Sequence, residues 1–269
     1  MYTFSSKLKT FSLILMAVGL LGIGYGFYTA PKDIKEVEQL LSAENHGGHG
    51  EVKHEAETTH AAKVENHEAT PATHKEVSEV DAHAEHEAHL THVLHQLQNK
   101  PWAALYVACI FFLLISMGTL AFYAIQQVAQ AGWSPVLFRV MQGITAYLPV
   151  GSVLFFIFLI LSGLHFNHLF VWLGEGVTDP TNANYDEIIA GKSGYLNFPF
   201  WIVRAAIFLL GWNLYRYYSR KNCLAQDEAN DNLNYKKNFK ISAGFLVFFI
   251  VSESIMSWDW IMSIDPHWF

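Results

Sequence analysis

Three ionisable residues lie in long apolar runs, where a charge is costly. Glu253 and Asp259 belong to the run ISAGFLVFFIVSESIMSWDWIMSIDPHWF at 241–269, and Arg204 lies near the start of the run at 198–218. A charge in hydrocarbon normally has a partner or a function. Counted from the ends of their runs, Glu253 and Arg204 lie roughly 13 Å and 9 Å deep, at 1.5 Å per residue. We therefore expect an Arg204–Glu253 ion pair, which would either serve a proton or quinone site or fix helix packing.

Two further groups of polar residues accompany these charges. Ser257 follows Glu253 by one helical turn and could share a hydrogen-bonded water chain with it, although small residues also allow close helix packing. His165 and His168 end another apolar run, in the sequence LHFNH. Because both lie on one turn, they cannot clamp a haem b between them. We expect them to contact a partner or a quinone head group, or to be solvated at the membrane interface.

A row of histidines recurs at every third position before the second apolar run. Eleven of the fourteen histidines fall in 31–100, and the row consists of His83, His86, His89, His92 and His95. On a helix this spacing places neighbours side by side while the row winds around the surface. Such pairs could hold Zn²⁺, Cu²⁺ or Ni²⁺ loosely. The row predicts either weak metal binding or a solvated, pH-sensitive tether.

The elements that position these residues are membrane helices. The chain is 52% hydrophobic and only 15% charged, whereas soluble domains carry about 25% charged residues. Five apolar runs reach the roughly 20 residues that a membrane helix needs, and none alternates with period two. We predict an all-α, polytopic membrane bundle with spans at 10–29, 102–126, 144–164, 198–218 and 241–262.

The distribution of basic residues predicts the orientation of these spans. Lysines precede the first span, and the 216–240 loop is rich in Lys and Arg, whereas 31–100 and 165–197 are mainly acidic or rich in His. The positive-inside rule then places the N-terminus in the cytoplasm and 31–100 in the periplasm. The short 127–143 loop contributes only Arg139.

Three regions follow from this reading. Residues 1–30 form an N-terminal membrane anchor, with a cleaved signal peptide as the alternative. Residues 31–100 form the tether, which we expect to be disordered to about residue 73 and helical over 75–98. Pro101 suits the first turn of the next helix, and 101–269 forms a four-helix membrane domain.

The chain offers no ligand motif for a resident redox cofactor. It has two cysteines, Cys109 and Cys223, and no CxxC or CxxCH motif. We therefore expect no attached haem and no cysteine-ligated iron–sulfur cluster in this chain. The predicted topology separates the two cysteines, so we expect no disulfide between them.

Three segments together resemble a known family. Residues 252–269, SESIMSWDWIMSIDPHWF, are similar to a segment of a membrane subunit of alternative complex III, often called quinone-binding subunit 2. The runs AGWSPVLFRVMQ at 131–142 and LSGLHFNHLF at 161–170 fit the same family. The resemblance covers 102–269, and the WDW…DPHW pattern is its specific part.

The resemblance implies a polysulfide-reductase-like membrane subunit of a quinol:cytochrome c oxidoreductase in the bacterial inner membrane. It implies a homologous large membrane subunit as neighbour, partner subunits with haem c and iron–sulfur clusters, and quinol, expected to be menaquinol, as the ligand. This chain would then contribute scaffolding, a surface facing the quinone, or a proton path through Glu253 and Asp259. Family members continue with further spans, so the resemblance also implies a C-terminally truncated chain.

Two other functions fit the same residues. A metal-handling transporter or sensor would use the histidine row, and an assembly scaffold would have no chemistry of its own. The lipid bilayer is a partner in every case, and we expect no nucleic-acid partner.

Overall fold

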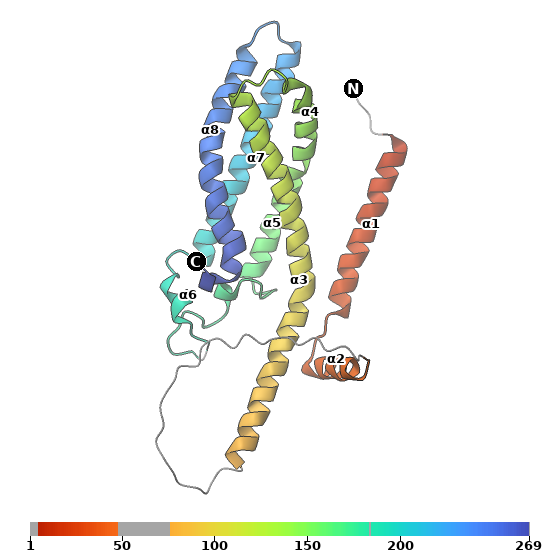
Figure 1. Ribbon diagram of the computed structural model, residues 1–269, viewed down its shortest axis with the longest axis vertical. Coiled ribbons are helices and arrows are strands. Elements are labelled where there is room, and N and C mark those ends of the chain that lie inside the picture. Colours follow the sequence, from red (N-terminus) through yellow and green to blue (C-terminus); the bar gives the residue numbers. More distant parts are fainter. Residues whose placement is uncertain (1–4, 48–75, 183, 269) are drawn as a thin grey trace. The chain divides into compact units, whose positions relative to one another are not determined.

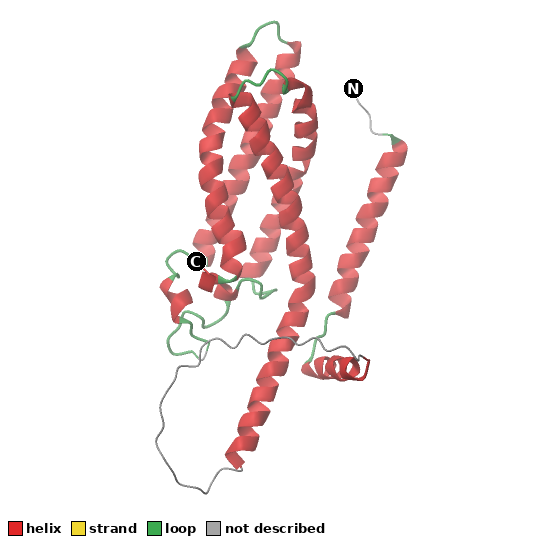
Figure 2. Cartoon of the chain, in the orientation of Figure 1, coloured by secondary structure: helices red, strands yellow, loops and turns green. Residues whose placement is uncertain are grey.

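The computed structural model describes residues 5–47, 76–182 and 184–268, which fall into two compact units, Met1–Pro101 and Trp102–Phe269. The described residues are helical and contain no strand, which confirms the predicted all-α class (Figure 2). Five helical stretches are long and apolar enough to cross a membrane, as predicted. The chain is thus built as a multi-pass membrane protein. These stretches are Ser6–Thr29, His89–Val128, Pro135–Gly163, Phe198–Glu228 and Leu233–Ile264.

The first unit begins with a helix that buries none of its residues. Helix α1 (Ser6–Thr29) starts where the Ser5 side chain accepts a hydrogen bond from the Leu8 N–H. Its length of 24 residues gives about 36 Å at 1.5 Å per residue, enough to cross a bilayer. A helix that is apolar all round suits a lipid environment.

The segment after α1 corrects one expectation. Helix α2 (Ile34–Gly47) forms where the sequence predicted a disordered tether, and residues 48–73 lie outside the described part. The Glu36 carboxylate accepts the Lys32 N–H at 2.9 Å, which satisfies a donor just before the first turn. Val37 is fully buried. Local hydrogen bonding and one apolar contact therefore order a segment whose composition alone favoured disorder.

Helix α3 (Glu76–Val128) is longer than predicted. It includes the helix expected over 75–98, but it runs on without a break, so Pro101 lies inside it rather than in a first turn. Proline in a helix interior removes one backbone hydrogen bond. Nearby, the Gln98 amide donates to the Pro31 carbonyl at 3.2 Å.

The connections in the second unit are also more helical than predicted. The 127–143 loop contains most of α4 (Pro135–Ile144), which continues through η1 (Thr145–Tyr147) into α5 (Leu148–Gly163). The predicted basic loop at 216–240 is largely made of the adjoining ends of α7 (Phe198–Glu228) and α8 (Leu233–Met256). Most of its positive charge therefore lies on helix ends, and the orientation of the helices remains a prediction.

Helices α5, α7 and α8 run alongside the later part of α3 in the second unit (Figure 1). The long connection between α5 and α7 contains η2 (Val171–Leu173) and α6 (Glu187–Gly191). After α8 the chain forms a π-helix, η3 (Ser257–Ile261), then the short turns η4 (Met262–Ile264) and η5 (Pro266–Trp268). Helix α6 and the C-terminal turns lie at the same end of the bundle.

One face of α8 packs along α7 with the spacing of a coiled-coil seam. Seven buried residues follow steps of three and four, or the sum of two such steps, from α8 through η3 and η4: Asn238, Ser242, Phe245, Ser252, Met256, Asp259 and Ser263. Trp260, one position after Asp259, is buried beside this row. Such steps keep side chains on the contact face of two helices. Several seam residues are polar and each of these is paired, for example Ser242 with the Tyr215 hydroxyl at 2.7 Å and Ser252 with the Trp212 Nε1–H at 2.9 Å.

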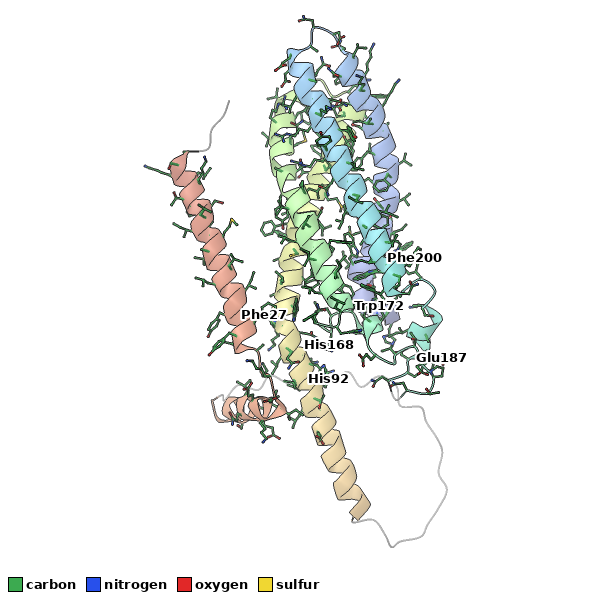
Figure 3. The ribbon with its side chains drawn as sticks, turned by 180° about the vertical axis from the view of Figure 1, so that it is seen from behind. Phe27, His92, His168, Trp172, Glu187 and Phe200 are labelled. Carbon is green, nitrogen blue, oxygen red and sulfur yellow. The ribbon has the colours of Figure 1, made fainter. Side chains whose placement is uncertain are left out.

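An aromatic core fills the bundle between these helices. The indole of Trp260 packs on Phe155 at 4.7 Å between ring centroids, and Tyr215 stacks on Phe245 at 3.8 Å. Among the tryptophans of this unit, Trp172, Trp201 and Trp260 are buried in the protein, whereas Trp258 and Trp268 are exposed. Figure 3 shows Trp172 close to one end of the bundle, the end to which Glu187 and Phe200 also belong.

Candidate functional site

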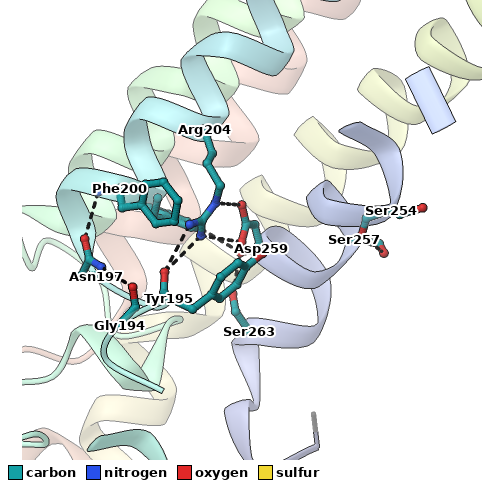
Figure 4. A network of polar contacts seen from close by, with 10 residues as sticks. Gly194, Tyr195, Asn197, Phe200, Arg204, Ser254, Ser257, Asp259 and Ser263 are labelled. Atoms are coloured by element: carbon teal, nitrogen blue, oxygen red, sulfur yellow. Dashed lines mark hydrogen bonds and ion pairs between the residues drawn. The ribbon is translucent and has the colours of Figure 1, made fainter. Parts of the chain in front are cut away.

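The strongest polar interaction in the bundle joins Arg204 of α7 to Asp259 of η3. The Arg204 Nε donates to Asp259 Oδ2 at 2.7 Å, and Nη2 donates to Oδ1 at the same distance (Figure 4). Arg204 is 7% exposed and Asp259 is fully buried. Two parallel charge-assisted bonds of this length are the strong, oriented form of an ion pair.

The rest of the guanidinium is equally well held. Its Nη1 and Nη2 atoms donate to the Tyr195 carbonyl at 3.2 and 3.3 Å. The guanidinium carbon lies 4.1 Å from the centroid of the Tyr195 ring and 4.2 Å from that of the Phe200 ring. Cation–π contacts of this kind gain strength where water is excluded. Arg204 therefore connects α7, the connection before it and the segment after α8.

The start of α7 is fixed by its own capping. The Asn197 side chain accepts the Phe200 N–H at 3.0 Å and donates to the carbonyls of Ser193 and Gly194, each at 3.2 Å (Figure 4). An Asn at this position satisfies one of the N–H groups that a helix start leaves unpaired. The cap therefore sets where Arg204, two turns further on, projects from α7.

Asp259 is presented by a π-helix whose carbonyls bond to side chains. The Asp259 carbonyl accepts the Trp201 Nε1–H at 2.9 Å and also the Ser263 hydroxyl. The Trp260 carbonyl accepts the Tyr106 hydroxyl. π-Helical turns are rare and occur often at functional sites. Here the altered turn is supported from α3, α7 and the chain after it.

This arrangement can lock helices together more readily than it can move protons. Both oxygens of the Asp259 carboxylate are engaged, so protonating it would require the pair to open. Nearby, the Tyr195 hydroxyl is buried and has no partner among the described residues. Burial raises the pKa of the Tyr195 phenol above its ordinary value, and the Asp259 carboxylate acts in the same direction. The phenol therefore stays protonated at neutral pH.

Glu253 is not the partner of Arg204, so the predicted Arg204–Glu253 pair is wrong. Glu253 is half-buried on α8, and within the described residues it has no ion pair or hydrogen bond from its carboxylate. It follows Ser252, a seam residue, by one position, and one position turns the side chain by about 100° from the seam. Ser257 donates to the Ser254 carbonyl at 2.9 Å. A water chain from Ser257 to Glu253 remains a prediction.

The histidines of the LHFNH sequence lie in the turn that follows α5. His165 and His168 are both exposed, and His165 has a left-handed backbone with φ of 61°. Figure 3 shows His168 near the end of the bundle to which Trp172 belongs. Their predicted role toward a partner or a quinone remains a prediction.

A third histidine, His267, makes the contacts that the sequence did not indicate. Its Nε2 lies 2.7 Å from Asp186 Oδ2, and its Nδ1 lies 3.4 Å from Asp265 Oδ1. The Lys192 ammonium donates to the Pro266 carbonyl. These contacts hold η5 against α6. The sequence could not predict the contact between Asp186 and His267, because they are 81 residues apart. Neither lies in a segment with a periodic pattern.

The histidine row lies on α3 as far as it can be followed. His89, His92 and His95 belong to its described part, and the side chains of His83 and His86 lie outside it. Among the described residues, no three His, Cys, Asp or Glu side chains are close enough to hold one metal ion. Metal binding by the whole row therefore remains a prediction.

Sequence reasoning also missed a polar cluster at the other end of the bundle. The Tyr123 hydroxyl accepts the Gln127 amide at 3.0 Å and the Gln142 amide at 3.4 Å, and the Asn238 amide donates to the Ser219 carbonyl at 3.0 Å. Gln127 and Asn238 line a cavity of about 230 Å³. Each leaves one buried oxygen without a partner in the described structure. Of these residues only Asn238 lies on the α8 seam, and that spacing was the signal that could have located it.

The Arg204–Asp259 pair, its aromatic cage and the π-helix together form the candidate functional site, with half-buried Glu253 nearby in sequence.

Cys109 and Cys223 are both free thiols, as expected. Comparison with protein-family models and with curated proteins finds no match for this chain.

Proposed function

We propose that this chain is a membrane subunit of a quinol:cytochrome c oxidoreductase of the alternative complex III type, in the bacterial inner membrane. The proposal rests on the similarity of residues 252–269 to that family. One observation carries it further: the WDW motif provides Asp259, the buried partner of a membrane-embedded arginine. The segment that resembles the family thus contains one partner of the buried ion pair.

The expected reaction divides between this chain and its partners. Oxidation of one quinol, here menaquinol, to quinone releases two electrons and two protons. Haem c and iron–sulfur centres on partner subunits would take the electrons. This chain would supply a surface facing the quinone and a carboxylate for protons. Glu253 suits the second role, since it is half-buried and Asp259 is fully engaged with Arg204.

The proposal is tested by deleting the gene and assaying membranes for quinol–cytochrome c reductase activity. We expect the activity to be lost and then restored by the wild-type gene. Tagged wild-type protein should co-purify with subunits that carry haem c and iron–sulfur clusters. Unchanged activity in the deletion strain, or purification without any redox subunit, would contradict the proposal.

A second function, an assembly scaffold, is favoured by the geometry of the ion pair. Both carboxylate oxygens of Asp259 and four of the five N–H donors of Arg204 bond within the chain, as in a site that fixes structure. The variant Glu253→Gln separates the two proposals. An assembled complex with a wild-type turnover rate and wild-type proton release would support the scaffold. An assembled complex that is slow in turnover would support a direct role for Glu253.

A further inference from the structure

A groove on the outer surface of the bundle runs between α5 and α7. It encloses about 540 Å³. Its deeper walls are apolar, with Val153, Phe156 and Ile157 on α5 facing Leu209 and Leu210 on α7. Several of these side chains are exposed, as expected for a surface that faces lipid. An apolar channel of this kind suits a hydrocarbon chain.

One end of the groove is polar and incompletely paired. The Asn213 amide donates both hydrogens, to Ser152 Oγ at 2.8 Å and to the Leu209 carbonyl at 2.7 Å. Its Oδ1 atom is buried and has no partner in the described structure, and the same holds for Nε of Arg216. Asn213 and Arg216 are three residues apart on α7, so they lie on the same face. The groove thus ends in one unmatched acceptor and one unmatched donor.

Charge determines what could fill that end. Arg216 has Arg220 and Lys221 just beyond it on α7. Within the described residues, none of the three forms an ion pair with an acidic side chain. Arginine recognises phosphate through charge-assisted bonds that a neutral ligand cannot provide. An anion that can also donate a hydrogen bond would satisfy both Arg216 and Asn213.

The depth of the polar end agrees with a lipid headgroup. Arg216 follows Phe198, the first residue of α7, by 18 positions, or about 27 Å along the helix axis. The hydrocarbon core of a bilayer is about 30 Å thick. If α7 begins at one membrane surface, Arg216 therefore reaches the opposite headgroup layer, and the apolar part of the groove lies within the hydrocarbon.

We propose that the α5–α7 groove binds one phosphatidylglycerol-type phospholipid. Its phosphate binds Arg216, a headgroup hydroxyl donates to Asn213 Oδ1, and one acyl chain lies along Val153, Ile157 and Leu210. A quinol could match the two hydrogen-bonding groups, but it is neutral and leaves the cluster of basic residues uncompensated. This inference is independent of the proposed oxidoreductase function.

The test is native mass spectrometry of the full chain, reconstituted in nanodiscs with equal parts of phosphatidylglycerol and phosphatidylcholine. We expect one retained phosphatidylglycerol per chain. Arg216→Gln should reduce its retention about tenfold or more, the effect of losing a hydrogen bond to a charged group. Lys236→Gln, a change of the same charge outside the groove, should leave it unchanged.

A second variant tests the acyl-chain part of the groove. Leu210→Trp narrows the groove at an exposed position, so it should displace the lipid without disturbing the core. Val203→Trp, at an exposed position of α7 outside the groove lining, is the control and should leave the lipid bound. Equal retention of both lipids, or full retention by Arg216→Gln, would overturn the proposal. So would displacement of the lipid by added menaquinone at equal concentration. Retention lost in both the Arg216 and Leu210 variants supports it.

Discussion

The guanidinium of Arg204 donates two hydrogen bonds of 2.7 Å to the carboxylate of Asp259, in a buried site. Burying two charges costs several kcal/mol per ion, and only excellent geometry with further hydrogen bonds offsets that cost. The Tyr195 carbonyl and the flanking rings provide such support. The pair therefore fixes one relative position of α7 and η3 rather than adding a large net stability.

Removing one partner should be strongly destabilising. Asp259→Asn leaves the Arg204 charge buried without its anion, and we expect a loss of about 3–5 kcal/mol in the free energy of unfolding. Glu253→Gln is the matched control, since Glu253 has no ion pair within the described residues, and it should change stability by less than about 1 kcal/mol. Thermal unfolding in detergent measures both. Equal losses in the two variants would show that Asp259 has no special role.

Charge alone should not replace the arginine. Arg204→Lys keeps the positive charge but loses the two-point contact with Asp259 and the planar contact with the Tyr195 and Phe200 rings. We expect a loss of about 2 kcal/mol, from one charged hydrogen bond and part of the cation–π contact. Arg220→Lys, at an exposed position, should be neutral. A fully stable Arg204→Lys protein would mean that simple charge neutralisation is sufficient.

The π-helix should depend on hydrogen bonds from other helices. Tyr106→Phe removes the hydroxyl that bonds the Trp260 carbonyl and leaves a buried acceptor unpaired. Such a loss costs about 1–3 kcal/mol. Because Trp260 is buried against Phe155, a change in tryptophan fluorescence should accompany the loss. Tyr217→Phe, at an exposed position, should affect neither property.

Apolar length alone located all five candidate spans, because a bilayer requires membrane helices of about that length. The seam between α7 and α8 explains why the predicted partner of Arg204 was wrong. Helix depth alone named the wrong partner for Arg204, because depth does not specify the face. Asp259 follows Ser252 by seven residues and stays on the seam, whereas Glu253 does not.

Other differences arose from local contacts that no period reveals. The hydrogen bond from the Lys32 N–H to Glu36 in the first turn of α2 caps a helix in a segment whose composition favours disorder. The pairing of His267 with Asp186 depends on how the long connection before α7 folds back. Both depend on contacts between particular side chains, which the composition of a segment does not reveal.

The predicted orientation can be tested by cysteine labelling. In a Cys109→Ser, Cys223→Ser background, Asn230→Cys and Thr178→Cys each place one thiol at an exposed position of a connection. The positive-inside rule places the first in the cytoplasm and the second in the periplasm. On cells with a permeabilised outer membrane, an impermeant maleimide should label only Thr178→Cys. Labelling of Asn230→Cys alone would invert the orientation.

The contact between α6 and the C-terminal turn should weaken in acid. The N–H of Ile189 and the His267 ring hold the pKa of Asp186 below its ordinary value. The folded state therefore binds fewer protons at this site than the unfolded state, whose Asp pKa is about 3.9. The stabilisation is complete above that value and is lost as the pH falls through the folded pKa. Hydrogen exchange of residues 262–268, corrected for the intrinsic pH dependence of amide exchange, should thus stay constant above about pH 5 and rise below about pH 4. Asp186→Asn should abolish that rise, whereas Asp179→Asn, which alters a separate turn capped at Thr181, should retain it. A rise of the same size in Asp186→Asn would assign the acid sensitivity to another group.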